Sequence, residues 1–150
     1  MDKSKVIAFL NKALGVEYAA VVQYCQHSAL VQGDARKMYE DFFNDASEEA
    51  RTHAKKVADW IVSLGGVPSV EVAGVEQATE ITEMLKQDLA LEKNALQAYR
   101  DAHAVTDDDA PIRFMLEEQI MLEQDDVWEI EKFLSAHKIK VGKKGVERAS

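Results

Sequence analysis

Apolar residues recur every three or four positions over four long stretches of the chain, which is the spacing that places them on one face of an α-helix. The stretches cover roughly residues 4–30, 35–64, 76–104 and 109–137. Glycine and proline, which interrupt helices, lie mostly between them. The pattern therefore predicts an all-α protein with four amphipathic helices.

The connections between the predicted helices differ in length. A short turn around Gly33 joins the first two helices, and the segment TDDDAP (106–111) joins the last two. In that second turn Asp108 or Asp109 can cap the fourth helix, with Pro111 in its first turn. A long segment with glycines and a proline, 65–77, separates helices two and three. We therefore expect an antiparallel four-helix bundle made of two hairpins, with one long crossover connection between them.

The size and composition indicate one folded domain. A chain of 150 residues can bury a substantial core, and 47% hydrophobic with 30% charged residues is typical of a soluble globular protein. We expect the bundle to occupy residues 1–137. The basic, glycine-containing segment 138–150 is expected to be a solvated tail.

Charge and cysteine content argue against several classes of protein. The formal net charge of −9 would repel phosphate, so we expect no nucleic-acid partner. Cys25 is the sole cysteine, which excludes an intrachain disulfide and a cysteine-based zinc site. We find no signal-peptide pattern and no apolar run long enough to span a membrane, so we expect no membrane association and a cytoplasmic location.

Each predicted helix carries a side chain on its apolar face that could bind a metal ion. These are Glu17, His53, Glu92 and Glu123, in helix order. An ionised glutamate in a core is costly unless it is paired or bound to a metal, and no lysine or arginine lies nearby on these faces. Any one of the four alone would be read as a residue at the rim of the core or as a hydrogen-bonded core histidine. Their coincidence on four helices predicts a metal site inside the bundle.

A weak internal repeat links the two hairpins. LGVEYAAVVQY (14–24) and LALEKNALQAY (89–99) share a leucine, a glutamate and a tyrosine at the same spacing. In both segments the acid and the tyrosine are seven residues apart and hence on one helix face. The repeat suggests that both halves present similar groups to a shared interior.

Three segments resemble the ferritin-like superfamily, and its bacterioferritin branch in particular. They are LNKALGVEYAAVVQYCQH in the first helix, HAKKVADWIVSLGGVPSV at the end of the second, and LKQDLALE in the third. The resemblance extends to about Leu134 and implies the ferritin-like bundle. It also implies that Glu17, Glu92 and His53 are iron ligands, with Tyr24 nearby.

Helix two departs from the family pattern, in which helices two and four each contribute a glutamate three residues before a histidine. Ala50 stands where the glutamate before His53 belongs. Glu49 borders the same face and could reach the site if the helix rotated slightly or carried a bulge, although we slightly favour a surface position for it. Arg51 stands where bacterioferritins carry their haem-ligand methionine, so haem is not expected.

Helix four departs from the same pattern. The best alignment takes Glu123 as the glutamate and places Asp126 where the histidine belongs. An ungapped register from Glu92 would instead select Asp125 and Trp128, and the sequence leaves this choice open. Asp126 would make the second metal position rich in oxygen ligands, which suits iron, manganese or another divalent cation.

The family resemblance implies ferroxidation, in which Fe(II) is bound, oxidised by dioxygen or peroxide, and stored or detoxified in a hollow oligomer. The altered site leaves open slower ferroxidation, a single metal ion, or metal binding alone. The alternative is a degenerate subunit with a structural or assembly role and no ferroxidase activity. A di-iron peroxidase or oxygenase on the same fold is a third option. Metal ions are the expected partners, together with further copies of the chain (a dimer or a larger shell) or a paralogous subunit.

Overall fold

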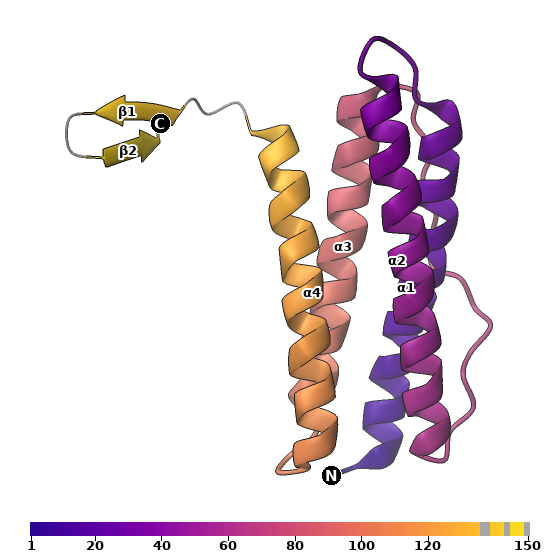
Figure 1. Ribbon diagram of the computed structural model, residues 1–150. Coiled ribbons are helices and arrows are strands. Elements are labelled where there is room, and N and C mark those ends of the chain that lie inside the picture. The colour runs from indigo at the N-terminus through magenta and orange to yellow at the C-terminus, as the bar shows by residue number, and fades with distance from the viewer. Residues whose placement is uncertain (136–138, 143–144, 149–150) are drawn as a thin grey trace.

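The computed structural model describes residues 1–135, 139–142 and 145–148, and its body is a bundle of four long helices (Figure 1). α1 and α2 form one antiparallel hairpin, and α3 and α4 form the other. The connection between α2 and α3 runs back along the length of the bundle (Figure 1). The predicted all-α bundle with one long crossover is therefore confirmed. The helices are α1 (Lys3–Leu30), α2 (Arg36–Ser63), α3 (Ile81–His103) and α4 (Ala110–Leu134).

The helix ends follow the capping signals in the sequence. Asp2 accepts hydrogen bonds from the backbone N–H groups of Ser4 and Lys5 at the start of α1. Asp109 accepts one from Ile112 at the start of α4, which confirms one of the two predicted caps. Such caps satisfy N–H groups that have no partner within the helix.

Two boundaries differ from the prediction. α3 begins at Ile81 rather than near residue 76, because the crossover still runs along α1 there. α4 ends at Leu134, and His137, where we expected it to end, lies outside the described residues. Beyond α4, β1 (Ile139–Gly142) pairs antiparallel with β2 (Gly145–Arg148), a hairpin that the basic, glycine-containing composition of the tail did not predict.

Three residues of α1 fasten the crossover to the bundle. Asn11 accepts a hydrogen bond from the Ser69 backbone N–H at 2.7 Å, and the Gly15 carbonyl accepts one from Ala73 at 3.0 Å. A Cβ atom on Gly15 would lie 3.3 Å from the crossover backbone, so glycine permits this close approach. Further along, Gln23 accepts from the backbone N–H of Glu76.

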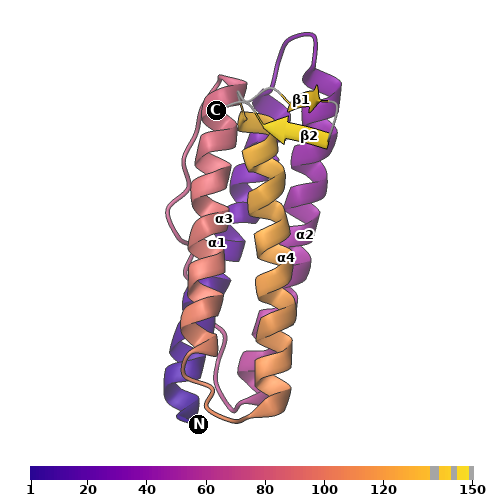
Figure 2. The same cartoon turned by 90° about the vertical axis from the view of Figure 1, so that its left-hand side faces the viewer.

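The core is formed where the apolar faces of the helices meet. α1 packs against both α2 and α3, and α3 packs against α4. Figure 2 shows the helices nearly parallel to one long axis. The polar residues on the four apolar faces are therefore directed into one interior.

α1 is long and apolar enough to cross a membrane by length and composition, contrary to the expectation from the sequence. Half of its most apolar window is buried inside the bundle. A core helix of a soluble protein passes the same test, so this single helix is weak evidence for a membrane span.

Candidate metal centre

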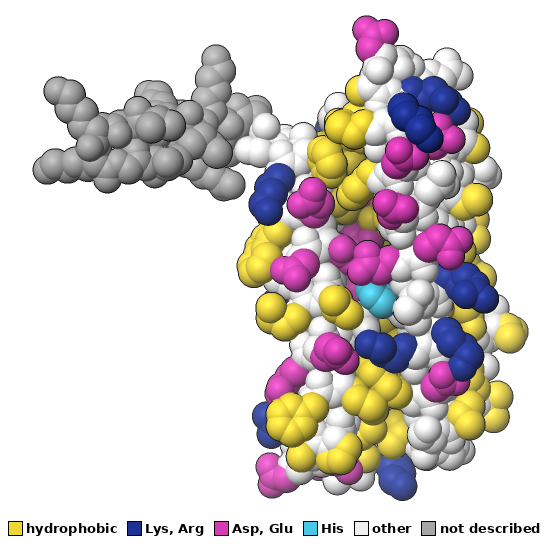
Figure 3. All heavy atoms as spheres, viewed as in Figure 1, with side chains coloured by type: hydrophobic (Ala, Val, Ile, Leu, Met, Phe, Trp, Pro, Cys, Tyr) yellow, Lys and Arg dark blue, Asp and Glu magenta, His cyan; other side chains and the backbone are white. Residues whose placement is uncertain are grey.

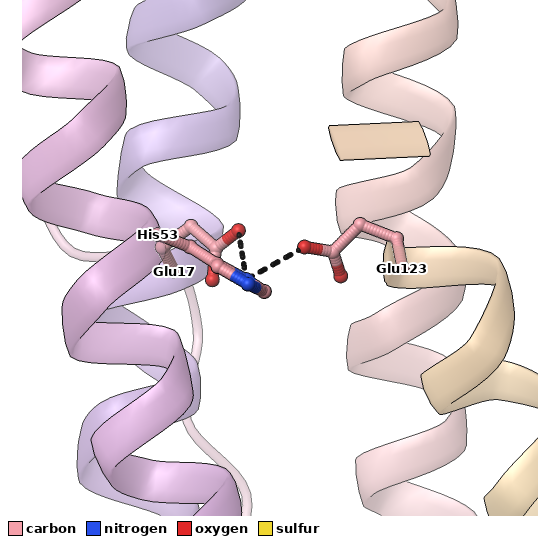
Figure 4. A group of neighbouring side chains, drawn as sticks. All are labelled: Glu17, His53 and Glu123. Carbon is pink, nitrogen blue, oxygen red and sulfur yellow. Dashed lines mark ion pairs between the residues drawn. The ribbon is translucent and has the colours of Figure 1, made fainter. Parts of the chain in front are cut away.

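Three helices bring Glu17, His53 and Glu123 together at mid-length of the bundle (Figure 4). All three side chains are buried. His53 Nδ1 lies 2.9 Å from Glu123 Oε1 and 3.5 Å from Glu17 Oε1. One ligand atom from each residue lies within 4.8 Å of the others, which is close enough for all three to bind one metal ion.

A second group consists of Glu92, Glu123 and Asp126, and its potential ligand atoms also lie within 4.8 Å of one another. Glu92 and Glu123 are buried, and Asp126 is half-buried. Glu123 belongs to both groups, which is the arrangement expected of a carboxylate that bridges two metal ions. The second group contains oxygen atoms alone, whereas the first contains a histidine nitrogen.

The tyrosines of the internal repeat form crossed hydrogen bonds between α1 and α3. Tyr24 on α1 donates to Glu92 on α3, and Tyr99 on α3 donates to Glu17 on α1 at 2.6 Å. All four side chains are buried. The two halves thus present matching groups to the shared interior, as the repeat suggested.

The negative charges of the buried carboxyl groups in the centre are only partly balanced by neighbouring groups. Burial raises the pKa of Glu17 and raises that of Glu92 well above its ordinary value. Burial, and then the Glu17 charge, raises the pKa of Glu123 to about 7. Burial, followed by the charges of Glu92, Glu49 and Glu123, raises the pKa of Asp126 to about 8. These shifts show the cost of ionising several buried acids close together.

His53 is the nearest cationic group to these acids. Burial lowers its pKa, but hydrogen bonds and charge from Glu123 and Glu17 outweigh burial and raise the pKa to about 10. The His53 ring can therefore neutralise part of the negative charge. In the described part of the chain, no lysine or arginine forms an ion pair with the carboxylates of either group. A divalent cation would remove the remaining conflict.

A cavity of about 250 Å³ connects the centre to the surface between α2 and α4. Figure 3 shows acidic side chains gathered around a histidine in a hollow midway along this face. The cavity is lined on the side of the centre by Glu17, His53, Glu92 and Asp126, and its remaining acidic lining residues are Asp45, Glu49 and Glu129. Cations can therefore approach along an acidic wall.

The structure shows where the residues at and beside the two departures from the family pattern lie. Glu49 lines the cavity with its side chain half-exposed, and its Oε1 lies 3.8 Å from His53 Nε2. It is thus at the rim of the centre but outside both ligand groups. Ala50 is buried in the cavity wall. On α4 the structure places Asp126 in the second group and leaves Asp125 exposed.

Two polar features of the interior were not predicted from the sequence. His27 Nδ1 lies 2.9 Å from Asp88 Oδ2, and Gln23 Nε2 donates to Asp88 Oδ1, one helical turn from Glu92. On α4, the buried Gln119 donates to Glu123 Oε1 at 2.9 Å. Their helical spacing from Tyr24, Glu92 and Glu123 was the available signal, because residues three or four apart share a face.

Comparison with known proteins agrees with this architecture. The family described as Ferritin, ferritin-like domain, matches residues 7–139. A structure described as a ferritin-like, diiron-carboxylate protein from Bacillus anthracis superimposes with a TM-score of 0.85 at 28% identity, covering 90% of this chain and 99% of that one.

Two further relatives point to the bacterioferritin branch. The dodecameric thioferritin from Bacteroides fragilis, described as bacterioferritin-related, has a TM-score of 0.81 at 25% identity, covering 89% of this chain and 86% of that one. The bacterial ferritin of Neisseria meningitidis serogroup B is 33% identical over 96 residues, which are 63% of this chain and 62% of that protein. The chain thus matches less than two thirds of the length of this relative.

Proposed function

The chain belongs to the ferritin-like family, and from that premise we propose that it binds iron inside its bundle and oxidises Fe(II) for storage or detoxification. The observation that carries the proposal is the pair of ligand groups that share Glu123. A single acid on a core face could be a residue at the rim of the core, but here four carboxylates and one histidine converge. The bacterioferritin-related relatives support iron as the metal.

The donor atoms fit two divalent cations. Glu17, His53 and Glu123 would hold one ion, and Glu92, Glu123 and Asp126 would hold the other. The four carboxylates balance the charge of two Fe(II) ions. Fe(II) is then the substrate: two Fe(II) ions give two electrons to one peroxide, which takes up two protons and becomes two water molecules. Dioxygen would serve as the alternative oxidant.

The residues around the ligands would prepare the site for this reaction. Tyr24 and Tyr99 hold the carboxylates of Glu92 and Glu17 in place before any ion arrives. The cavity beside Ala50 gives ions and oxidant a path from the surface. The oxygen-only position would bind a hard cation such as Mn(II) as well as Fe(II). Haem is not expected, because Arg51 stands at the methionine position.

We further infer that the chain assembles with copies of itself in the cytoplasm. The related thioferritin from Bacteroides fragilis is described as dodecameric, and a hollow assembly would retain oxidised iron. Two experiments test these inferences. Metal analysis of the purified protein should find about two ions per chain, and light scattering should find an assembly rather than a monomer.

The decisive experiment follows Fe(III) formation after Fe(II) is added in air or with peroxide. We expect oxidation to exceed the rate in buffer and to saturate at about two Fe(II) per chain in its fast phase. Assembly without bound metal, and with oxidation no faster than in buffer, would instead identify a structural subunit. Metal binding without fast oxidation would leave the binding half of the proposal intact and overturn the enzymatic half.

A further inference from the structure

Two glutamines are fully buried in the described part of the bundle, and their amides are used differently. Gln23 uses both ends: its Nε2 donates to Asp88 at 2.8 Å, and its Oε1 accepts from the Glu76 backbone at 3.0 Å. These bonds tie α1 to α3 and to the crossover. Gln119 makes one hydrogen bond, from Nε2 to Glu123 Oε1, and its own Oε1 has no partner among the described residues.

The half-satisfied amide of Gln119 carries a cost that an apolar side chain would avoid. A buried polar atom without a hydrogen bond costs about 1–3 kcal/mol. Methionine or leucine would fill a similar volume on this core-facing position of α4 without that cost. The single partner of Gln119 is the carboxylate shared by both ligand groups. Its amide is therefore explained by what it does to Glu123.

The two oxygens of Glu123 have different surroundings. Oε1 lies 2.9 Å from both Gln119 Nε2 and His53 Nδ1, whereas the buried Oε2 has no hydrogen-bond partner in the described residues. His53 Nδ1 also faces Glu17, so it is the nitrogen directed at the first ligand group. If this nitrogen held a metal ion, it would no longer donate to Glu123. Gln119 would then be the donor that still holds Oε1.

Building on the proposed function, we propose that Gln119 is a positioning residue of the metal centre. Its amide keeps Glu123 Oε1 turned toward His53 and leaves Oε2 for the position formed with Glu92 and Asp126. Outer partners that orient a ligand typically change metal affinity about 10–100-fold when they are removed. We therefore expect Gln119 to control the second ion more strongly than the first.

The test is a calorimetric and spectroscopic titration of the metal-free protein with Co(II). The wild type should bind two ions per chain. Gln119→Met should weaken the second ion about 10–100-fold while changing the first less and without lowering Tm. The matched control is Gln23→Met, which removes a buried amide whose partners lie outside both groups. It should lower Tm and leave the Co(II) isotherm unchanged.

The outcomes separate this inference from the proposed function. A wild type that binds no Co(II) overturns both. A wild type that binds two ions, with an identical isotherm for Gln119→Met, overturns the positioning role alone. A variant that loses Tm and weakens both ions equally also overturns it, since that is a structural role.

If Gln119→Met does not fold, wild-type crystals soaked in Mn(II) provide the answer. The inference requires the Gln119 amide to remain within hydrogen-bond distance of Glu123 Oε1, with an ion on Oε2. An amide turned away from Glu123, or an Oε2 without an ion, overturns it.

Discussion

α1 and α3 contribute the same types of side chain to the centre, whereas α2 and α4 contribute different ones. We call these the matched and the unmatched half. α1 and α3 each provide a glutamate and, seven residues later, a tyrosine that donates to the glutamate of the other helix. α2 provides His53 and an alanine at the inner carboxylate position, and α4 provides two carboxylates, Glu123 and Asp126. The pseudosymmetry of the bundle is therefore kept on one side of the centre and lost on the other.

The difference shows what the centre preserves. The family pattern, with one glutamate on each of two helices and a glutamate–histidine pair on each of the others, contains four carboxylates and two histidines. This chain also brings four carboxylates to its two groups, but one histidine. The negative charge available to two divalent cations is thus unchanged. The carboxylate missing at Ala50 is offset by Asp126, which stands where the family pattern has its second histidine.

The largest effect on metal content should come from changing Glu123, the residue shared by the two ligand groups. Glu123→Ala removes a ligand from both groups, so bound metal should fall from about two ions per chain toward none. Glu17→Ala removes a ligand from the first group alone and should leave about one ion. Metal analysis after dialysis against Mn(II) measures both. Equal metal content in the two variants would contradict the shared role of Glu123.

Restoring the missing carboxylate of α2 should make the unmatched half resemble the family pattern. Ala50 lines the cavity, so a glutamate has room to turn toward the centre. Ala50→Glu should tighten metal binding at least about tenfold, about 1.4 kcal/mol. It should destabilise the metal-free protein, because it adds another buried acid. The control Ala54→Glu, equally buried but outside this cavity, should destabilise without tightening binding.

The stability of the metal-free protein should fall as the pH rises. Asp126 has its pKa raised from 3.8 to about 8, so the unfolded chain releases this proton first and folding weakens between those values. His53 has its pKa raised from 6.5 to about 10, and its stabilising charge is lost over that range. Tm should therefore decrease from pH 5 to pH 9.

The stabilising effect of added Mn(II) should change in the opposite direction, because metal binding requires deprotonated ligands. Asp126→Asn should flatten the pH dependence of Tm in the metal-free protein. A Tm that rises between pH 5 and pH 9, or a variant with an unchanged slope, would contradict the contribution of Asp126 to this dependence.

The crossed tyrosines provide a direct test of the matched half. Tyr24→Phe and Tyr99→Phe each remove the phenol that donates to a buried carboxylate, and each should cost about 1–3 kcal/mol. Urea denaturation of the metal-free variants measures this cost. We expect nearly equal losses in the free energy of unfolding. A large difference between the two variants would show that the two similar hydrogen bonds do not contribute equally to stability.

The smallest effect should come from the rim. Glu49 is half-exposed and 3.8 Å from His53 Nε2, so Glu49→Ala should slow Fe(II) oxidation by a few-fold at most and leave the number of bound ions unchanged. Screening by solvent limits the contribution of such exposed charges. Glu48→Ala, next to it on the exposed face, is the control and should have no effect. Loss of an ion in Glu49→Ala would place Glu49 among the ligands.

Periodicity alone was sufficient to place four of the candidate ligands on the apolar faces of their helices. Glu17, His53, Glu92 and Glu123 lie on apolar faces, and a repeat of three and four residues fixes which side of a helix faces the core. It could not decide how the helices are shifted along one another. For that reason the sequence leaves the choice between Asp125 and Asp126 open. In the structure Asp126 lies in the second group and Asp125 is exposed.

Other features depended on tertiary contacts that no local pattern encodes. Residues 76–80 fit a helical spacing, but the Glu76 backbone is bound by Gln23 on α1 and the helix starts at Ile81. The repeat indicated that both halves carry a glutamate and a tyrosine, but it could not show that each tyrosine reaches the glutamate of the other half. Gln119 was not singled out from the sequence, because its role depends on the one hydrogen bond that it donates to Glu123.

The distribution of the two ligand groups over the hairpins has a consequence for folding. Glu92, Glu123 and Asp126 all lie on α3 and α4, so the oxygen-only group is complete once that hairpin closes. The other group combines Glu17 and His53 with Glu123, and it exists only after the two hairpins have docked across the long connection. Closing such a long loop is the slower event in chain kinetics. During refolding, the α3–α4 position should become competent to hold an ion before the position that contains the histidine.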